Sequence, residues 1–160
     1  MNEYLFDHID ILPANIHTLD GSIDKTEIIA ACAAYEEKIA SVGGIDFQLL
    51  GIGRTGNIGF NEPGGSFEKE THCVALAQST IEANKRFFER EEDVPRFAYT
   101  MGIRSIMQAR RVLLIVSGES KAEIVKKAFT GPVTPEVPAS VLQLHNNVTL
   151  VGDEAALSKI

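Results

Sequence analysis

Long hydrophobic runs are scarce in this chain of 160 residues, and their scarcity excludes several classes of protein. The apolar runs are as short as Val112–Val116, whereas a membrane-spanning helix needs roughly 20 consecutive apolar residues. The N-terminus reads Met-Asn-Glu-Tyr-Leu-Phe-Asp-His and has acidic side chains where a signal peptide would have Lys or Arg. We therefore expect a cytoplasmic protein with no membrane segment.

Cysteine is also rare. The chain contains 2 cysteines, Cys32 and Cys73, and neither CxxC nor a Cys/His ligand spacing occurs. The 4 histidines show no metal-like spacing either, and a structural role is the better interpretation of each. We expect two buried, inert thiols and no histidine or cysteine metal site.

Basic residues are fewer than acidic ones. Lys and Arg number 15 against 22 Asp and Glu, which gives a net charge of −7, and the cations form no stripe. Binding to a nucleic-acid backbone needs clustered Lys and Arg, so we expect no nucleic-acid partner. A small anionic ligand stays possible, because one or two cations with backbone N–H groups suffice for it.

Strand-like segments alternate with helical ones along the chain. The first helix is expected at 24–42, where Ile28, Cys32, Tyr35, Ile39 and Val42 share one face. Further helices are expected at 79–88, 103–109, 120–129 and 138–144, and strands at 45–50, 73–77, 97–101, 112–116 and 148–151. This alternation predicts an α/β fold with a mostly parallel sheet, in one domain over residues 1–160.

Two local patterns sharpen these predictions. The sequence Ser79-Thr80-Ile81-Glu82 has the form of a capping box, which predicts a helix start. Five consecutive apolar residues at Val112–Val116 predict a strand that is buried on both faces.

A glycine-rich loop follows the first predicted strand. The spacing Gly51-x-Gly53-x-x-Gly56 matches the dinucleotide fingerprint, but that fingerprint needs a helix to open within the glycines. Residues 57–64 cannot open a regular helix, so a nucleotide cofactor is not expected. Asn57, Asn61 and Glu62 instead indicate an active-site loop, with Glu62 as the candidate acid, base or orienting group.

A second loop, residues 117–121, joins the most apolar strand to a helix. Free N–H groups at the helix start, together with Lys121, would bind an anion such as phosphate. The alternative is an exposed lysine beside Glu119 or Glu123. Arg86 has a similar pair of interpretations, as a ligand-binding cation or as a solvated helix residue.

Together these residues resemble the glucosamine-6-phosphate deaminase (isomerase) family, a branch of an α/β superfamily that also contains 6-phosphogluconolactonases. The most specific match is Phe60-Asn61-Glu62-Pro63-Gly64, where the lactonase branch differs. The remaining matches extend over nearly the whole chain, at 8–16, 35–39, 51–56, 83–88, 118–122, 142–145 and 153–156. The resemblance implies a three-layer, Rossmann-like sandwich.

The resemblance also implies an activity in amino sugar metabolism. An aminohexose phosphate is ring-opened, a proton moves from C2 to C1, and hydrolysis of the resulting imine gives a ketohexose phosphate and ammonia. No metal or organic cofactor is required, and the resemblance implies a homo-oligomer. By position, Glu62 matches the family's glutamate, Arg86 and Lys121 match its phosphate-binding cations, and Gly51 and Gly53 match its backbone contacts to the sugar.

Two positions in the catalytic loop depart from the family. Thr55 stands where the family has Asp, and Asn57 stands where it has the His that opens the ring. An Asn amide does not titrate near neutral pH and cannot shuttle a proton as imidazole does. Asn57 therefore predicts weak, altered or absent deaminase activity.

Members of the family also have a long preceding segment, with a phosphate-binding loop and the Asp that moves the C2 proton. We therefore expect a domain that is incomplete at its N-terminus and exposes sheet edge and core surface. Three functions stay open: a deaminase, a non-catalytic sugar-phosphate-binding or assembly module, and an isomerase or lactonase for a related sugar phosphate.

Overall fold

The computed structural model describes residues 1–24 and 26–160. The first helix begins later than predicted, at Ile28, and residue 25 of the predicted range lies outside the described residues. The helices are η1 (Phe6–His8), η2 (Pro13–Asn15), α1 (Ile28–Ser41), α2 (Gln78–Asn84), η3 (Lys85–Phe87), η4 (Glu91–Asp93), α3 (Ile103–Met107), η5 (Glu119–Lys121), α4 (Ala122–Thr130), η6 (Pro138–Leu144) and α5 (Glu154–Leu157). The strands are β1 (Phe47–Gly51), β2 (His72–Ala75), β3 (Phe97–Thr100), β4 (Arg111–Val116) and β5 (Val148–Gly152).

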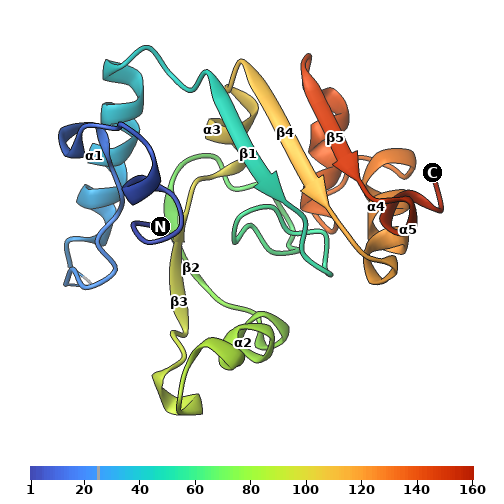
Figure 1. The fold of residues 1–160 in the computed structure, drawn as a ribbon, viewed down its shortest axis with the longest axis horizontal. Coiled ribbons are helices and arrows are strands. Elements are labelled where there is room, and N and C mark those ends of the chain that lie inside the picture. Colours follow the sequence, from blue (N-terminus) through green and yellow to red (C-terminus); the bar gives the residue numbers. More distant parts are fainter. Residues whose placement is uncertain (25) are drawn as a thin grey trace.

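The main sheet is parallel, with the strand order β1-β4-β5 (Figure 1). Leu114 at its centre is paired with Leu50 on one side and with Leu150 on the other. The predicted α/β class with a parallel sheet is confirmed. All three strands run in the same direction, so their carboxyl ends meet at one edge, where the two predicted functional loops begin.

Helices cover one face of this sheet. Val112, Leu114 and Val116 of β4 are buried in a core shared with α3, α4 and η6. The opposite face is bare, since Leu49 and Ile115 are 58% and 49% exposed. Burial of β4 on both faces was therefore a wrong prediction. The predicted exposure of core surface is confirmed, and the described residues supply one helical layer rather than the two of a three-layer sandwich.

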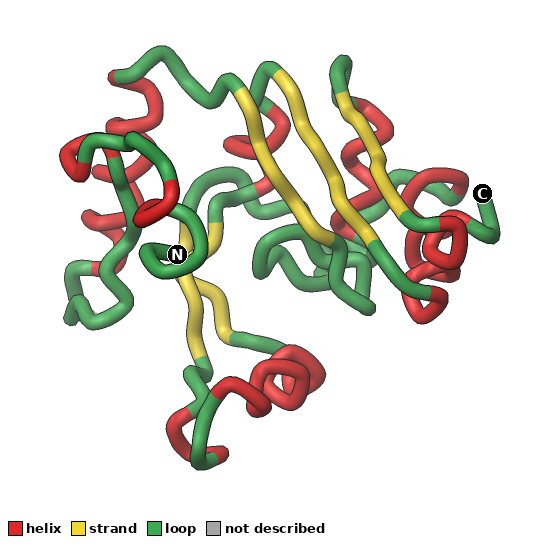
Figure 2. Tube along the Cα trace, viewed as in Figure 1, coloured by secondary structure: helices red, strands yellow, loops and turns green. Residues whose placement is uncertain are grey.

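A second, smaller sheet projects from the main body. Strands β2 and β3 pair in antiparallel fashion, and they carry α2, η3 and η4 at their outer end (Figures 1 and 2). Both strands were predicted, at 73–77 and 97–101, but a second sheet was not. A pattern of apolar residues locates a strand without naming its partner, so the sequence could not show this separate arm.

Helix α1 is anchored by one carboxylate. Glu36 Oε1 accepts hydrogen bonds from the Thr71 backbone N–H at 2.8 Å, the Thr71 hydroxyl at 2.5 Å and the Ser105 hydroxyl at 2.6 Å. Burial raises the pKa of Glu36, but the hydrogen bonds from Ser105 and Thr71 and the charge of Arg104 outweigh it, so the net pKa is lowered. The ionised form of Glu36 is therefore the one that stabilises the fold.

This anchor gives the first testable prediction. A carboxyl with a lowered pKa stabilises the folded state above its unfolded pKa of about 4.3, and that stability is lost as pH falls through the folded pKa. We expect Glu36→Gln to lower the free energy of unfolding by about 1–2 kcal/mol at pH 7, a value reduced for partial exposure. The difference from the parent should shrink below pH 4 in urea titrations run at several pH values. Glu37→Gln, at an exposed neighbouring position, is the control; a pH-independent loss in Glu36→Gln would contradict the ionic explanation.

No helix among the described residues is long and apolar enough to span a membrane.

Candidate functional site

The glycine-rich loop closes on itself directly after β1. Gly53 N–H donates to the Asn57 carbonyl at 2.9 Å, and Gly56 N–H donates to the Gly53 carbonyl at 3.1 Å. A Cβ on Gly53 would overlap with the Asn57 side-chain amide, and Gly56 has a φ of +85°, which favours glycine. The described chain forms no helix between β1 and β2, so the dinucleotide interpretation stays excluded.

The structure brings the three predicted catalytic residues together. The Thr55 hydroxyl lies 2.9 Å from Asn57 Oδ1 and 3.0 Å from Glu62 Oε2. Asn57 Nδ2 donates to the Gly59 carbonyl at 2.9 Å, which fixes its amide with the oxygen toward Thr55. Of these three side chains, Glu62 alone carries an ionisable group.

A fourth residue, Thr80, completes the cluster from another element. Its hydroxyl donates to Glu62 Oε1 at 2.5 Å, so each carboxylate oxygen faces one threonine hydroxyl. Sequence reasoning missed this role because Thr80 lay inside the predicted capping box. That box is absent, since α2 has Ala77 as its N-cap and no side-chain cap.

Lys121 lies over the same loop. Its ammonium donates to the Ile52 carbonyl at 2.6 Å, one residue beyond the end of β1. Burial lowers the pKa of Lys121, and the charge of Arg54 lowers it further. The alternative was an exposed lysine beside Glu119 or Glu123. Lys121 is instead half-buried and donates to the Ile52 carbonyl, and Glu123 pairs with Lys159 at 2.9 Å.

The backbone at the second loop differs from the prediction. Gly118 N–H donates to both oxygens of Asp153, at 3.1 and 2.9 Å, so it is not free to bind an anion. Asp153 also caps α5 by accepting from Ala156 N–H at 2.7 Å. Arg54 adds a second positive charge near Lys121, and sequence reasoning had not singled out Arg54.

The second predicted phosphate-binding cation, Arg86, lies on η3 of the projecting arm. It is exposed, and its guanidinium stacks on the Phe87 ring at 4.8 Å from the centroid. The hydrogen bond from Thr80 to Glu62 joins this arm to the catalytic loop. The other predicted binding residues, Gly51 and Gly53, lie at the end of β1 and in the closed turn.

Both thiols are free, and burial raises the pKa of Cys32, with smaller contributions from Cys73 and Glu36. Within residues 1–24 and 26–160, no three His, Cys, Asp or Glu side chains are grouped as metal ligands would be.

Known proteins are similar in sequence to this chain over nearly all of its length. The family profile described as glucosamine-6-phosphate isomerases/6-phosphogluconolactonase matches residues 1–151. Glucosamine-6-phosphate deaminases from Clostridioides difficile (strain 630) and Geobacillus sp. (strain WCH70) are 51% and 54% identical over 160 residues, all of this chain. The chain spans 64% and 63% of the length of these two relatives.

Solved structures share the fold. A monomeric glucosamine-6-phosphate deaminase matches with a TM-score of 0.93 at 46% identity, over 100% of this chain and 66% of that one. A 6-phosphogluconolactonase from Thermotoga maritima matches with a TM-score of 0.68 at 23% identity, over 95% of this chain and 62% of that one, a likeness that shows the fold alone. The chain therefore belongs to the family of glucosamine-6-phosphate isomerases and 6-phosphogluconolactonases.

Proposed function

We propose that the protein converts an aminohexose phosphate, with glucosamine 6-phosphate as the first candidate, to a ketohexose phosphate and ammonia. The observation that supports this most strongly is the position of Glu62, a carboxylate held by two threonine hydroxyls at the carboxyl end of a parallel strand. That edge is where open parallel sheets bind their ligands.

Glu62 is the proton carrier in this proposal. Ring opening takes the proton from the anomeric hydroxyl and delivers one to the ring oxygen. Asn57 can orient either oxygen by hydrogen bonding but cannot carry the proton, so the transfer falls to Glu62, directly or through a water molecule. Thr55 and Thr80 fix the direction in which the carboxylate faces.

Lys121 is the proposed phosphate ligand. Its ammonium has three N–H donors, and the Ile52 carbonyl takes one of them, so two are available to phosphate oxygens. Arg54 lies close enough to lower the pKa of Lys121 and adds positive charge to the same place. Arg86 would contribute from the arm.

We expect Lys121→Met to weaken binding of glucosamine 6-phosphate at least tenfold, since a hydrogen bond between charged groups contributes about 1.5–3 kcal/mol. Methionine keeps the apolar length of the side chain and removes its charge. Calorimetric titration with glucosamine 6-phosphate and with glucosamine measures the phosphate contribution in parent and variant. Lys126→Met, on the exposed side of α4, is the matched control; an equal loss in both variants would speak against a phosphate site at Lys121.

Turnover decides between the two main candidates. If the protein is a deaminase, incubation with glucosamine 6-phosphate releases ammonia and fructose 6-phosphate together, and Glu62→Gln removes the reaction. The second candidate, a non-catalytic sugar-phosphate-binding or assembly module, is favoured by Asn57 and Thr55 in place of titratable groups. It predicts a higher melting temperature with the sugar phosphate and no ammonia. A panel with other sugar phosphates and lactones separates the isomerase and lactonase alternatives.

Two further proposals come from the family. We expect a homo-oligomer, although one related deaminase of solved structure is described as monomeric; analytical ultracentrifugation measures this. We also expect the protein to act in the cytoplasm, where amino sugar metabolism takes place.

A further inference from the structure

The hydroxyl of Thr55 faces two acceptors with one hydrogen. It lies 2.9 Å from Asn57 Oδ1 and 3.0 Å from Glu62 Oε2. An ionised carboxylate only accepts, and Asn57 keeps its oxygen toward Thr55 because its Nδ2 donates to the Gly59 carbonyl at 2.9 Å. A threonine hydroxyl donates to one atom at a time. Thr55 therefore leaves one member of this acceptor pair, Asn57 Oδ1 and Glu62 Oε2, without a donor.

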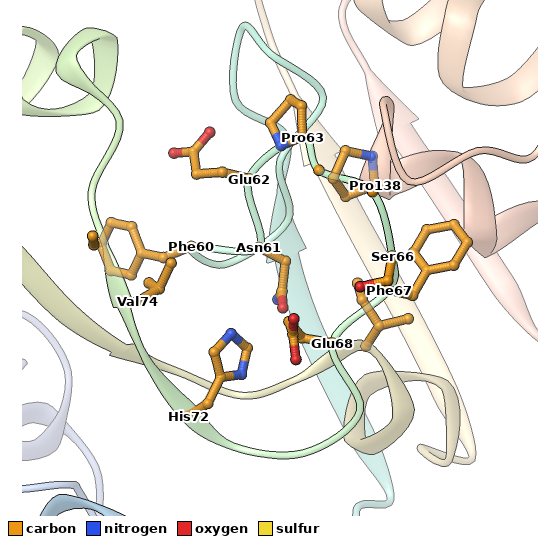
Figure 3. Close-up of a pocket in the computed structure, with 14 residues that line it drawn as sticks. Phe60, Asn61, Glu62, Pro63, Ser66, Phe67, Glu68, His72, Val74 and Pro138 are labelled. Carbon is orange, nitrogen blue, oxygen red and sulfur yellow. The ribbon is translucent and has the colours of Figure 1, made fainter.

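The neighbouring side chains do not supply the missing donor. The Thr80 hydroxyl donates to the other carboxylate oxygen, Glu62 Oε1, at 2.5 Å, and its single hydrogen is used there. Figure 3 shows the Glu62 carboxylate directed away from the side chains of Asn61 and His72. In the described part of the chain, the hydroxyls of Thr55 and Thr80 are the only hydrogen-bond donors to the Glu62 carboxylate and Asn57 Oδ1.

This shortage of one hydrogen is a property of this particular chain. Thr55 and Asn57 are the two positions of the catalytic loop that depart from the family, and neither side chain can take up or release a proton to correct the count. Thr55, Asn57 and Glu62 are all half-buried, so water reaches the acceptor pair only in part. An acceptor that lacks a donor in such a place raises the free energy of the folded state. A ligand that brings one donor to the acceptor pair removes this cost.

We propose that the acceptor pair selects ligands that place a hydroxyl group beside it and rejects ligands that place a carbonyl group there. A hydroxyl supplies the one missing hydrogen, whereas a carbonyl oxygen would face two acceptors. The inference rests on the proposed function for the identity of the ligand: in a hexose 6-phosphate whose ring opens at Glu62, this hydroxyl is the one on C1. The site then accepts the cyclic sugar phosphate and excludes the corresponding lactone, which has a carbonyl at C1. Asn57 and Thr55 thereby become specificity-determining residues.

The ligand test compares glucose 6-phosphate with 1,5-anhydroglucitol 6-phosphate, which has the same ring and phosphate and lacks only the C1 hydroxyl. Calorimetric titration of the parent should show glucose 6-phosphate binding at least tenfold more tightly, because a site that hydrogen-bonds a hydroxyl rejects an analogue without it. Neither ligand has an amine, so deaminase turnover does not disturb the measurement. Equal affinity for the two ligands would overturn the inference. An affinity that depends on the amine of glucosamine 6-phosphate, and not on the C1 hydroxyl, would assign the acceptor pair to an ammonium group instead.

Glu62→Gln supplies the missing hydrogen and keeps the shape of the side chain. With its amide nitrogen in place of Oε2, it donates to Thr55 while Thr55 donates to Asn57. This variant should bind the two sugar phosphates with equal affinity, and its melting temperature without ligand should rise by about 2 °C or more. Glu68→Gln, at an exposed position of the segment between β1 and β2, is the control for the loss of one negative charge and should keep the tenfold preference.

Binding and turnover can fail separately. A preference for the C1 hydroxyl in a protein that releases no ammonia from glucosamine 6-phosphate supports this inference and contradicts the proposed deaminase activity. Ammonia release by a parent that binds the two test ligands equally does the reverse. A preference that persists in Glu62→Gln contradicts the inference, as does a lower melting temperature of that variant or a failure of the parent to bind either sugar phosphate.

Discussion

We expect the double variant Thr55→Asp, Asn57→His to turn over glucosamine 6-phosphate about 10²–10⁴ times faster than the parent. That factor corresponds to about 3–5 kcal/mol of activation free energy, the usual contribution of a positioned general acid or base. The reason is local. In the proposed function the residue at position 57 handles the proton of ring opening, and Thr55 already bridges that position to Glu62.

Gly53 has no Cβ, and the Asn57 side chain occupies the place where one would stand, which is the place a histidine at position 57 would use. An Asp at position 55 would accept a hydrogen bond from the imidazole and fix its tautomer, which the threonine hydroxyl does less well. The paired release of ammonia and fructose 6-phosphate measures the rate. Its pH dependence should acquire a titration near pH 6–7 that the parent lacks.

Asn57→Gln is the matched control, because it keeps an amide and adds no titrating group. Its turnover should stay at or below that of the parent. If the double variant binds the substrate normally and still fails to gain activity, then proton transfer at position 57 does not limit the rate. The non-catalytic candidate would then be favoured.

The catalytic cluster shows what a local pattern can predict. Asn57 and Glu62 lie within one short loop, so glycine spacing and side-chain type sufficed to group them, whereas Thr55 was singled out only by the family resemblance. Glu62 was the predicted acid or base, and the structure places its carboxylate between two hydroxyls. The assignment of these roles to catalysis stays a prediction until turnover is measured.

Contacts between distant segments lay beyond this kind of reasoning. Thr80 reaches Glu62 across 18 positions of sequence, and Asp153 reaches Gly118 across 35. Each bond depends on how two elements pack, and neither residue type nor spacing encodes that. The capping box at Ser79 and the free N–H groups at residue 118 were both locally reasonable, and tertiary hydrogen bonds replaced both.

The central strand shows a further limit. Five apolar residues in a row correctly located β4, yet they implied burial on both faces. The structure buries Leu114 fully and leaves its neighbour Ile115 about half exposed, at 0% and 49%. An apolar sequence shows that a strand is suited to burial on both faces. It does not show whether this chain supplies a covering layer for each face.

That asymmetry gives the second large prediction. Leu114→Ala should lower the free energy of unfolding by about 2–5 kcal/mol, because it removes buried methyl groups from the middle of the core. Ile115→Ala, one residue along the same strand, should lower it by less than about 1 kcal/mol, because its side chain faces solvent. Urea denaturation with a common m-value measures both changes.

The comparison is matched, since both variants shorten a branched aliphatic side chain in one strand. Repeating it at several protein concentrations tests the bare face directly. If Ile115→Ala is as destabilising as Leu114→Ala, and more so at high concentration, that face is covered in solution by another copy of the chain. A small, concentration-independent effect of Ile115→Ala instead means that the core formed with α3, α4 and η6 stabilises the fold by itself.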